Sequence, residues 1–231
     1  MPGVIVRAAA LFCVAALLGG CNIVVSKTPV FAQADTAGAP AFRPGLWVGE
    51  KDDCHFNEAT PADKWPDCAE PVIVTPGEVR GVGAQAQKQS TPYLLAAGDP
   101  LVLQAQADVD LSGGADASAS GNGHASASVS VEGSAPRPFL FLGVHPLSFD
   151  HQGRIIRMEQ WPVMCGPPPP EPTPGTPPEK ASYVTRNPLP GLTIEDQVCT
   201  PANKAAVINA ARQTRAYGQV QTSHWVRDAA P

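Results

Sequence analysis

The chain has 231 residues, with 16 Lys and Arg against 21 Asp and Glu, which gives a formal net charge of −5. This acidic balance argues against nucleic acid and against anionic lipid headgroups as partners, because both repel a negative surface. The 26 prolines are unusually numerous and clustered. Without the low-complexity stretches, about 146 residues remain in 42–107, 135–165 and 180–228, which is enough for one domain with a buried core.

Residues 1–20 have the features of an export signal. Arg7 and the free amine give a short positive region, and residues 8–18 are apolar without interruption. A core of this length is typical of a signal peptide and is too short to cross a bilayer, which needs about 20 residues. Leu-Gly-Gly-Cys follows directly at 18–21, and this run resembles the lipobox of bacterial lipoproteins. The resemblance implies cleavage before Cys21 and attachment of lipid to its thiol.

Two other interpretations of this segment remain open. One is a buried helix that happens to end in Gly-Gly-Cys, and the other is ordinary secretion with cleavage after Ala34, at the small-x-small run 32–34. The Ala34 site lies well past the apolar core, whereas cleavage normally follows the core closely. For the lipoprotein interpretation, Asn22 rather than Asp after the cysteine implies, by the same resemblance, the outer membrane of a diderm bacterium. The folded part would then lie in the periplasm.

Residues 21–41 are expected to form a flexible, lipidated tether. They mix Pro, Ala, Gly and Thr without periodicity, which is the composition of a linker. Such a spacer would hold the following domain, residues 42–228, away from the membrane.

The first half of that domain is expected to contain short strands. The candidates are 44–48, 72–74 and 93–97, with a turn at 76–77 and one helical turn between Thr60 and Pro66. The clearest pattern in the chain is the alternation at 101–111, which predicts a strand with one buried face.

A low-complexity insert follows at 112–135. Alternation returns at 125–131, where Ala and Val alternate with Ser, so one interpretation is a long β-hairpin over 101–131. The other is that this stretch is disordered, because alanine and serine bury little apolar area to offset the entropy of the chain.

The second half is expected to add strands, a proline-rich loop and one helix. The strands are predicted at 139–142, 154–164 and 220–226, with a turn at 150–153 and an extended loop at 166–179. Thr200 is the expected N-cap of a helix over 201–216, which Gly218 would end. Trp47-Val48 and Trp225-Val226 could lie on first and last strands that meet and close the sheet.

These elements predict a mainly β, antiparallel fold, either a sandwich or a small barrel, with one C-terminal α-helix and an α+β class overall. Strands and helices do not alternate along the chain. A doubly wound nucleotide-binding fold is therefore not expected.

Four cysteines, Cys54, Cys68, Cys165 and Cys199, remain beside Cys13 of the signal and Cys21. In an oxidising compartment they predict two disulfides with three possible pairings. An internal repeat favours Cys54–Cys68 and Cys165–Cys199: each Thr-Pro-Ala run, at 60–62 and 200–202, follows a cysteine, and each Trp-Pro run, at 65–66 and 161–162, precedes one. Coincidence stays open, because Thr-Pro-Ala is also a common helix start. A zinc site is disfavoured by the lack of Cys-x-x-Cys spacing.

No motif for catalysis, cofactor binding or metal binding stands out, so no catalytic residue, cofactor or metal ligand is predicted. His145 and His151 flank one predicted strand and could converge with His55, but their spacing is not that of metal ligands, and surface histidines are the simpler interpretation. The acidic residues of 52–67 do not have the order of a calcium-binding loop either, and they are expected to be solvated loop charges. Two further sets complete the candidates: the histidines His124 and His224, and the tryptophans Trp47, Trp65, Trp161 and Trp225, expected to pack in the core or against the disulfides rather than to bind a ligand.

Three classes of function remain. The first is a lipid-anchored envelope protein with a structural or protein-interaction role, whose partners are the membrane, through Cys21, and an envelope protein. The second is a periplasmic module that binds a small ligand inside a β-barrel. The third is a periplasmic hydrolase, which would need a histidine with a carboxylate partner in a cleft.

Overall fold

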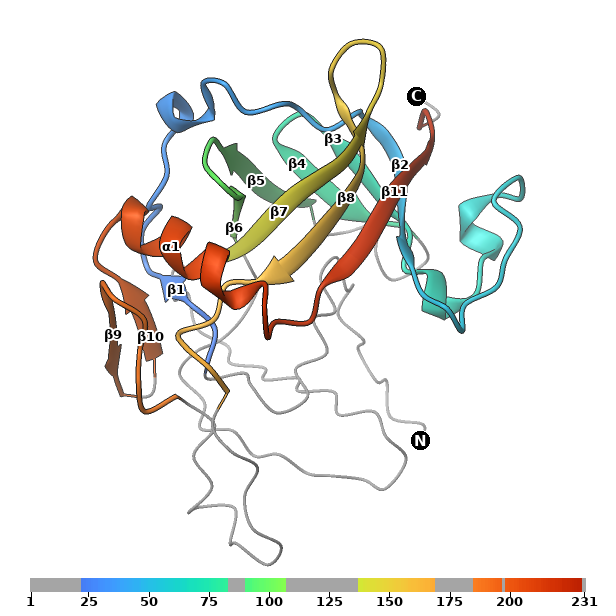
Figure 1. The fold of residues 1–231 in the computed structure, drawn as a ribbon. Helices are drawn as coiled ribbons and strands as arrows, with labels where there is room; N and C mark the ends of the chain where they lie inside the picture. The colour runs from blue at the N-terminus through green and yellow to red at the C-terminus, as the bar shows by residue number, and fades with distance from the viewer. Residues whose placement is uncertain (1–21, 83–89, 107–136, 169–184, 197, 230–231) are drawn as a thin grey trace, which may run out of the picture.

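The computed structural model describes residues 22–82, 90–106, 137–168, 185–196 and 198–229 (Figure 1). Eight antiparallel strands close into a barrel, in which each strand pairs with its neighbour along the chain and β11 returns to β2. The mainly β fold with one helix near the C-terminus is confirmed, and the barrel is the form it takes. The barrel strands are β2 (Gly45–Glu50), β3 (Val72–Thr75), β4 (Glu78–Gly81), β5 (Ser90–Ala96), β6 (Leu101–Gln106), β7 (Phe139–Phe149), β8 (Ile155–Pro162) and β11 (Gln221–Arg227).

Alternation along each strand decides which side chains enter the barrel. On β6, Leu103 and Ala105 belong to the interior cluster, whereas Val102 and Gln104 lie on the outer side beneath other segments. The strand is confirmed, but the expectation of a single buried face is wrong, because residues 22–41 and α1 also cover the outer face and Gln104 is buried there with hydrogen-bond partners. The predicted strand extends to residue 111, but the structure describes it only as far as Gln106.

The first and last barrel strands meet as the two Trp-Val pairs predicted. Trp47 of β2 lies directly opposite Trp225 of β11, and this pairing closes the barrel. Gly45 begins β2 with φ 138°, and a Cβ added there would lie 2.4 Å from the carbonyl oxygen of Arg227. Only glycine fits this backbone conformation and this close approach.

Residues 22–41 are not the free tether that their composition predicts. Val24 and Phe31 are almost fully buried, and β1 (Val25–Ser26) pairs with the start of β7. The buried Gln104 side chain holds the next stretch, since its Oε1 accepts hydrogen bonds from the amides of Val30 and Phe31 and its Nε2 donates to the Phe31 carbonyl. The segment lacks periodicity because it contributes separate anchoring residues to the outer wall rather than one regular element. A short 3₁₀ helix, η1 (Gln33–Thr36), follows these anchors.

The helix begins later than predicted. Thr200 and Pro201 belong to β10 (Val198–Pro201), which forms a hairpin with β9 (Leu192–Glu195), a pair that the sequence pattern did not predict. The helix α1 (Lys204–Thr214) starts after Asn203, whose side chain accepts a hydrogen bond from the Ala206 amide at 3.0 Å. A side-chain cap was correctly expected here, but the capping residue is Asn203.

Helix α1 covers the outside of the barrel where β6, β7 and β8 lie (Figure 1). Val207, Ala210 and Ala211 are fully buried against it. The indole of Trp161 lies beneath the helix and donates a hydrogen bond to the Ala211 carbonyl at 2.8 Å. Gly143 makes room for this ring, because a Cβ there would lie 2.3 Å from it.

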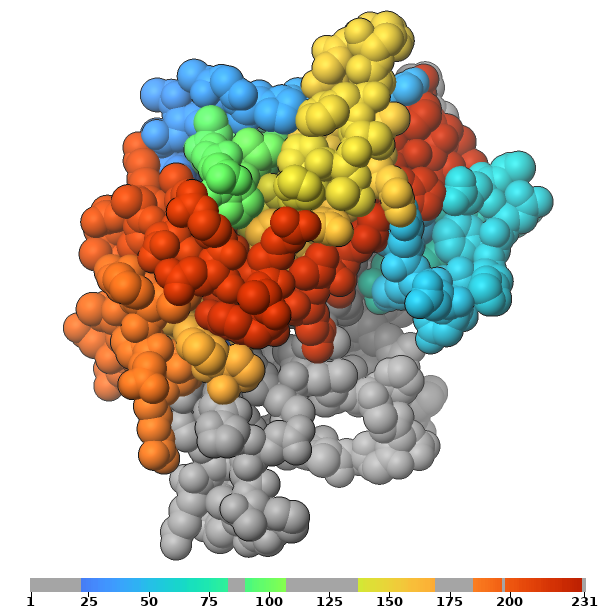
Figure 2. All heavy atoms as spheres, viewed as in Figure 1, coloured from blue at the N-terminus to red at the C-terminus, as the bar shows by residue number. Residues whose placement is uncertain are grey.

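The structure pairs Cys54 with Cys68 and Cys165 with Cys199, the pairing that the internal repeat favoured. Cys165 and Cys199 tie the chain after β8 to β10 and are fully buried. The other disulfide closes residues 51–70, which stand out from the barrel as a separate lobe (cyan in Figure 2). This disulfide lobe contains two 3₁₀ turns, η2 (Ala62–Lys64) and η3 (Asp67–Ala69), where one helical turn was expected.

Several predictions fall outside the described residues. They are the signal 1–20 with Cys21, the insert 112–135 with His124, and nearly all of the proline-rich loop 166–179. Within the described ranges, no helix is long and apolar enough to cross a membrane.

Candidate functional site

The barrel interior contains a hollow of about 70 Å³. It lies toward the end of the barrel where β8 and β2 finish and where β3 and β11 begin, here called the open end. Its apolar wall comes from residues of six strands and of the segment before β2. The wall residues are Phe42, Trp47, Val48, Val72, Val74, Val79, Tyr93, Leu103 and Met158.

The aromatic side chains stack in the half of the barrel away from the open end. Phe42 lies edge-on to Trp47 with ring centroids 5.8 Å apart, and its ring is 5.7 Å from that of Tyr93. The Tyr93 hydroxyl donates to the Thr75 carbonyl at 3.0 Å, and burial raises the pKa of this phenol. The half of the barrel away from the open end is therefore filled by packed aromatic rings, and the hollow lies nearer the open end.

The wall becomes polar at the open end. Gln160 of β8 and Ser223 of β11 both lie inside, each 8% exposed, with Gln160 Nε2 3.4 Å from Ser223 Oγ. Gln160 Oε1 has no hydrogen-bond partner within the described part of the chain. An unsatisfied buried acceptor costs about 1–3 kcal/mol, so native proteins usually provide a partner for it.

A charged pair forms the outer rim of the hollow. The Lys51 ammonium lies 2.9 Å from a carboxylate oxygen of Glu70, and both side chains are about one-third exposed. Gln221 of β11 also lines the hollow between this pair and Ser223. Because the two charges neutralise each other, the rim offers polar contacts without a strong field of either sign.

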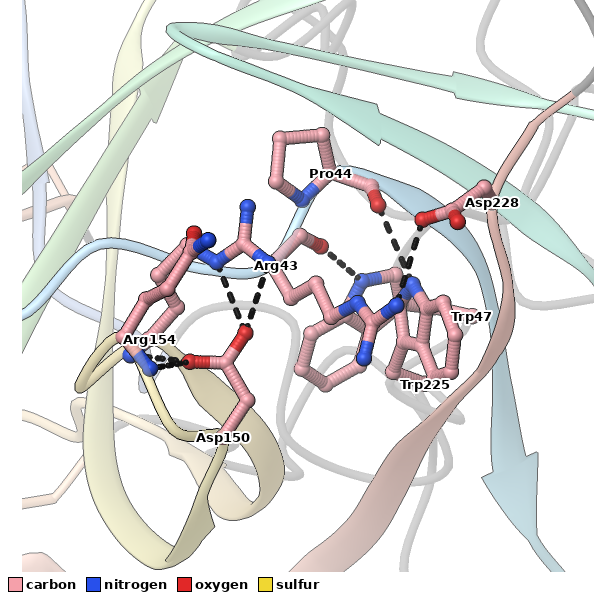
Figure 3. Close-up of polar contacts among 8 residues, drawn as sticks. Arg43, Pro44, Trp47, Asp150, Arg154, Trp225 and Asp228 are labelled. Carbon is pink, nitrogen blue, oxygen red and sulfur yellow. Dashed lines mark hydrogen bonds and ion pairs between the residues drawn. The ribbon is translucent and has the colours of Figure 1, made fainter.

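The opposite end of the barrel, the closed end, is sealed by the segment that leads into β2 (Figure 3). The indole nitrogen of Trp47 donates to the Arg43 carbonyl at 2.9 Å, and that of Trp225 donates to the Pro44 carbonyl at 3.0 Å. The Arg43 guanidinium lies 3.4 Å from the centre of the Trp225 ring and 3.4 Å from Asp228 Oδ1. Among the described residues, the segment before β2 thus seals the closed end, and the hollow lies nearer the open end.

The four tryptophans divide between these environments. Trp47 lines the hollow, Trp225 helps to seal the closed end, and Trp161 lies on the outer wall under α1. Trp65 stacks on Phe56 inside the disulfide lobe, with ring centroids 4.6 Å apart. Core or disulfide packing is found for Trp47, Trp161 and Trp65, whereas Trp225 is only partly buried; Trp47 in addition forms part of the candidate site.

The predicted histidines do not converge as His145, His151 and His55. His145 lies on β7, and His151 lies in the turn between β7 and β8. His55 instead lines a surface depression together with His224, between the disulfide lobe and β11. Among the described residues, no group of three or more His, Cys, Asp or Glu side chains is arranged to hold a metal ion.

His224 joins the disulfide lobe to the barrel wall. Its Nε2 lies 2.9 Å from Glu58 Oε1, and its Nδ1 lies 3.2 Å from Glu50 Oε1. Arg157 donates two hydrogen bonds to Glu50, at 2.8 and 2.7 Å, which hold the pKa of this carboxyl below its usual value. Arg227 adds hydrogen bonds to backbone carbonyls of the lobe at Glu58 and Thr60.

This arrangement differs from that of a hydrolytic triad. A catalytic histidine uses one ring nitrogen for an orienting carboxylate and the other to activate a nucleophile. His224 Nε2 faces Glu58 and Nδ1 faces Glu50, so among the described residues neither nitrogen is directed at a hydroxyl. The cluster fits a structural clamp between the lobe and the barrel.

The sequence reasoning missed the polar residues of the open end. Gln221, Ser223 and Trp225 occupy alternate positions of one strand, and this pattern would have indicated two polar residues on the core-facing side. Gln160 follows Met158 in the same way on β8. Comparisons with protein-family models, with curated proteins and with solved structures gave no match.

Proposed function

We propose that this chain is an exported envelope protein, anchored by lipid on Cys21, whose barrel binds a small molecule with an apolar end and a hydrogen-bond donor. The observation that carries the binding function is the unsatisfied Gln160 Oε1 in the wall of a hollow that is otherwise mainly apolar. Ligand sites in proteins typically combine such apolar walls with a few polar groups. Eight-stranded barrels have interiors just wide enough to be filled by side chains or to hold one small ligand.

The size and charge of the hollow limit the ligand. A cavity needs about 10–15 Å³ to hold one water molecule, and an apolar cavity of about 150 Å³ binds benzene. A hollow of about 70 Å³ therefore takes a short alkyl chain or the edge of a ring, while the rest of the ligand lies at the rim. The paired charges of Lys51 and Glu70 favour a neutral ligand, and Gln160 Oε1 requires a donor such as a hydroxyl or an amide N–H.

Packing of the N-terminal residues supports maturation at Cys21 over cleavage after Ala34. Cleavage after Ala34 would remove Val24 and Phe31 from the outer core and leave the buried Gln104 side chain without its partners. Both losses would destabilise the fold. A mature chain that starts at Cys21 keeps all of these contacts. The two disulfides also fit an oxidising compartment.

The anchor is tested by mass spectrometry of the mature N-terminus and by fractionation of cells that express Cys21→Ala. Acylated Cys21, and release of the variant from the membrane fraction, are the expected results. Unchanged membrane association, or a mature chain starting at Asp35, contradicts lipid anchoring. Binding is tested separately, because the Cys21→Ala protein contains the complete barrel.

The probes for binding are straight-chain primary alcohols from butanol to octanol and alkyl methyl ethers of equal length. We expect Trp47 fluorescence to change on binding, affinity to rise with chain length until the hollow is full, and alcohols to bind about tenfold more tightly than ethers. Gln160→Leu should remove this preference for alcohols. Gln106→Leu, the same change at an outward position of β6, should leave it intact.

If neither series changes the fluorescence or the melting temperature of the parent protein, the binding function is wrong. An interaction role is then the second candidate. Its support is the exposed pair Leu147 and Phe149, 39% and 50% exposed, near the end of β7. Photo-crosslinking in intact cells from position 149, with position 151 as control, should then yield one defined adduct at 149 only.

A further inference from the structure

Asn22 is packed into the domain, although the composition of residues 21–41 predicted a flexible tether there. Its side chain is fully buried, with Nδ2 donating to the Gly166 carbonyl at 3.0 Å and Oδ1 accepting from the Thr185 amide at 3.0 Å. Its own carbonyl accepts from the Cys165 amide at 2.6 Å. Three hydrogen bonds on a buried residue fix the position of this backbone with respect to the barrel.

Only one peptide bond separates this fixed residue from Cys21. One residue reaches at most about 3.6 Å, so a lipid on Cys21 would bring the membrane surface next to Asn22. The flexible spacer that the sequence predicted, 20 residues long, would have allowed a mean separation of about 25 Å. The packing of residues 22–41 thus removes the expected spacer.

The fixed residue lies at the open end of the barrel. Asn22 and Val24 pair with Cys165 and Val163, directly after β8 ends at Pro162, and Gln160 in the same strand lines the hollow. Figure 1 shows the described chain starting at this end, whereas the turn between β7 and β8 lies at the other. The anchor and the entrance to the hollow are therefore on the same side of the molecule.

We infer that the barrel rests on the membrane surface with its open end toward the lipid headgroups, so that its ligand enters from the membrane side. This inference depends on the proposed lipid on Cys21. The occupant of the surface around Asn22 is the headgroup layer of the membrane that holds the anchor. The ligand is accordingly a small amphipathic molecule that partitions into this layer.

Orientation is measured with the full, lipidated protein in phosphatidylcholine vesicles that contain a phospholipid with a nitroxide on its headgroup. One fluorescent amino acid replaces either Arg186, which is exposed and follows the Asn22 partner Thr185, or His151, which is exposed at the opposite end. Quenching at 186 should exceed quenching at 151 several-fold. The same labels in Cys21→Ala, mixed with the same vesicles, provide the unanchored control.

A matched variant introduces a flexible spacer by inserting 20 Gly and Ser residues between Cys21 and Asn22. This insertion should reduce quenching at 186 to the level seen at 151, while the protein remains bound to the vesicles. Equal quenching at both labels without the spacer, or quenching at 186 that the spacer does not change, overturns the orientation alone. Absence of acyl groups on Cys21 overturns the anchor as well, and mass spectrometry separates these two outcomes.

Discussion

The two ends of the barrel differ in how their interior is filled, although the strands alternate in the same way at both. At the closed end, Phe42 fills the interior, and the indole N–H groups of Trp47 and Trp225 both find backbone carbonyls. At the open end, β11 places Ser223 inward, and Gln160 keeps an unsatisfied acceptor. Alternation only decides which residues face inward. Whether an end is filled or hollow depends on the chemistry of those residues and on what crosses the end.

The largest expected effect comes from emptying the closed end with Trp47→Ala. This side chain is 1% exposed and holds the crossing segment through its hydrogen bond to Arg43. We expect the free energy of unfolding to fall by about 3–5 kcal/mol, measured by urea denaturation of the Cys21→Ala protein. Val220→Ala, at a position 40% exposed, should change it by less than about 0.5 kcal/mol. A loss below about 1 kcal/mol for Trp47→Ala would show that the closed end does not stabilise the barrel.

Attachment of residues 22–41 to the outer wall of the barrel is tested by Gln104→Ala. The variant leaves the amides of Val30 and Phe31 without their buried acceptor, and we expect a loss of about 2 kcal/mol. Gln106→Ala changes the same residue type two positions along β6, where the side chain is partly exposed, and should cost under about 0.5 kcal/mol. Limited proteolysis within 22–41 should accelerate only in the Gln104 variant. Equal rates in both would mean that the packing of residues 22–41 does not depend on the Gln104 hydrogen bonds.

A change of opposite sign is expected at the open end. Gln160→Leu replaces an unsatisfied amide by an apolar side chain, so stability should stay constant or rise by up to about 1 kcal/mol. The same variant loses the preference for alcohols over ethers. A polar group that lowers stability but is needed for binding is the mark of a functional site. A clear loss of stability in Gln160→Leu would instead make the Gln160–Ser223 contact structural.

The strands with clear hydrophobic patterns were predicted well from the sequence. Strands β6, β7 and β8 contain alternating or apolar runs that place buried residues on the barrel interior, so their existence followed from the pattern. The meeting of Trp47 with Trp225 was also predicted, since both follow the pattern of strands at the two ends of one domain. The strands themselves depend on residues that are close together in the sequence, whereas the meeting of Trp47 with Trp225 was inferred from the repeated Trp-Val pair in the first and last strands.

The features that were missed depend on closure of the barrel. Gln160, Ser223 and the pair Lys51–Glu70 come from four separate places in the chain, and only the pairing of β11 with both β2 and β8 brings them to one rim. Residues 22–41 resemble a linker because their anchors, among them Asn22 and Phe31, interact with distant partners and not with one another. Composition alone does not reveal contacts of this kind.

A pH-dependent effect is expected at the turn beside the closed end, where the Asp150 side chain is 4% exposed. Burial would raise the pKa of its carboxyl, but hydrogen bonds from the Arg154 amide and side chain and from the Gln152 amide outweigh burial and lower it to about 2 (Figure 3). An unfolded Asp titrates near about 3.9. Its contribution to stability is therefore complete above about pH 4 and is lost as the pH falls through 2.

Asp150→Asn removes this contribution. We expect the difference in unfolding free energy between parent and variant to be constant above about pH 5 and to shrink between pH 4 and 2, measured by urea denaturation at each pH. Glu50, whose pKa is also lowered, titrates in both proteins and cancels in the difference. Parallel pH profiles down to pH 2 would show that the Asp150 hydrogen bonds do not favour the charged carboxylate.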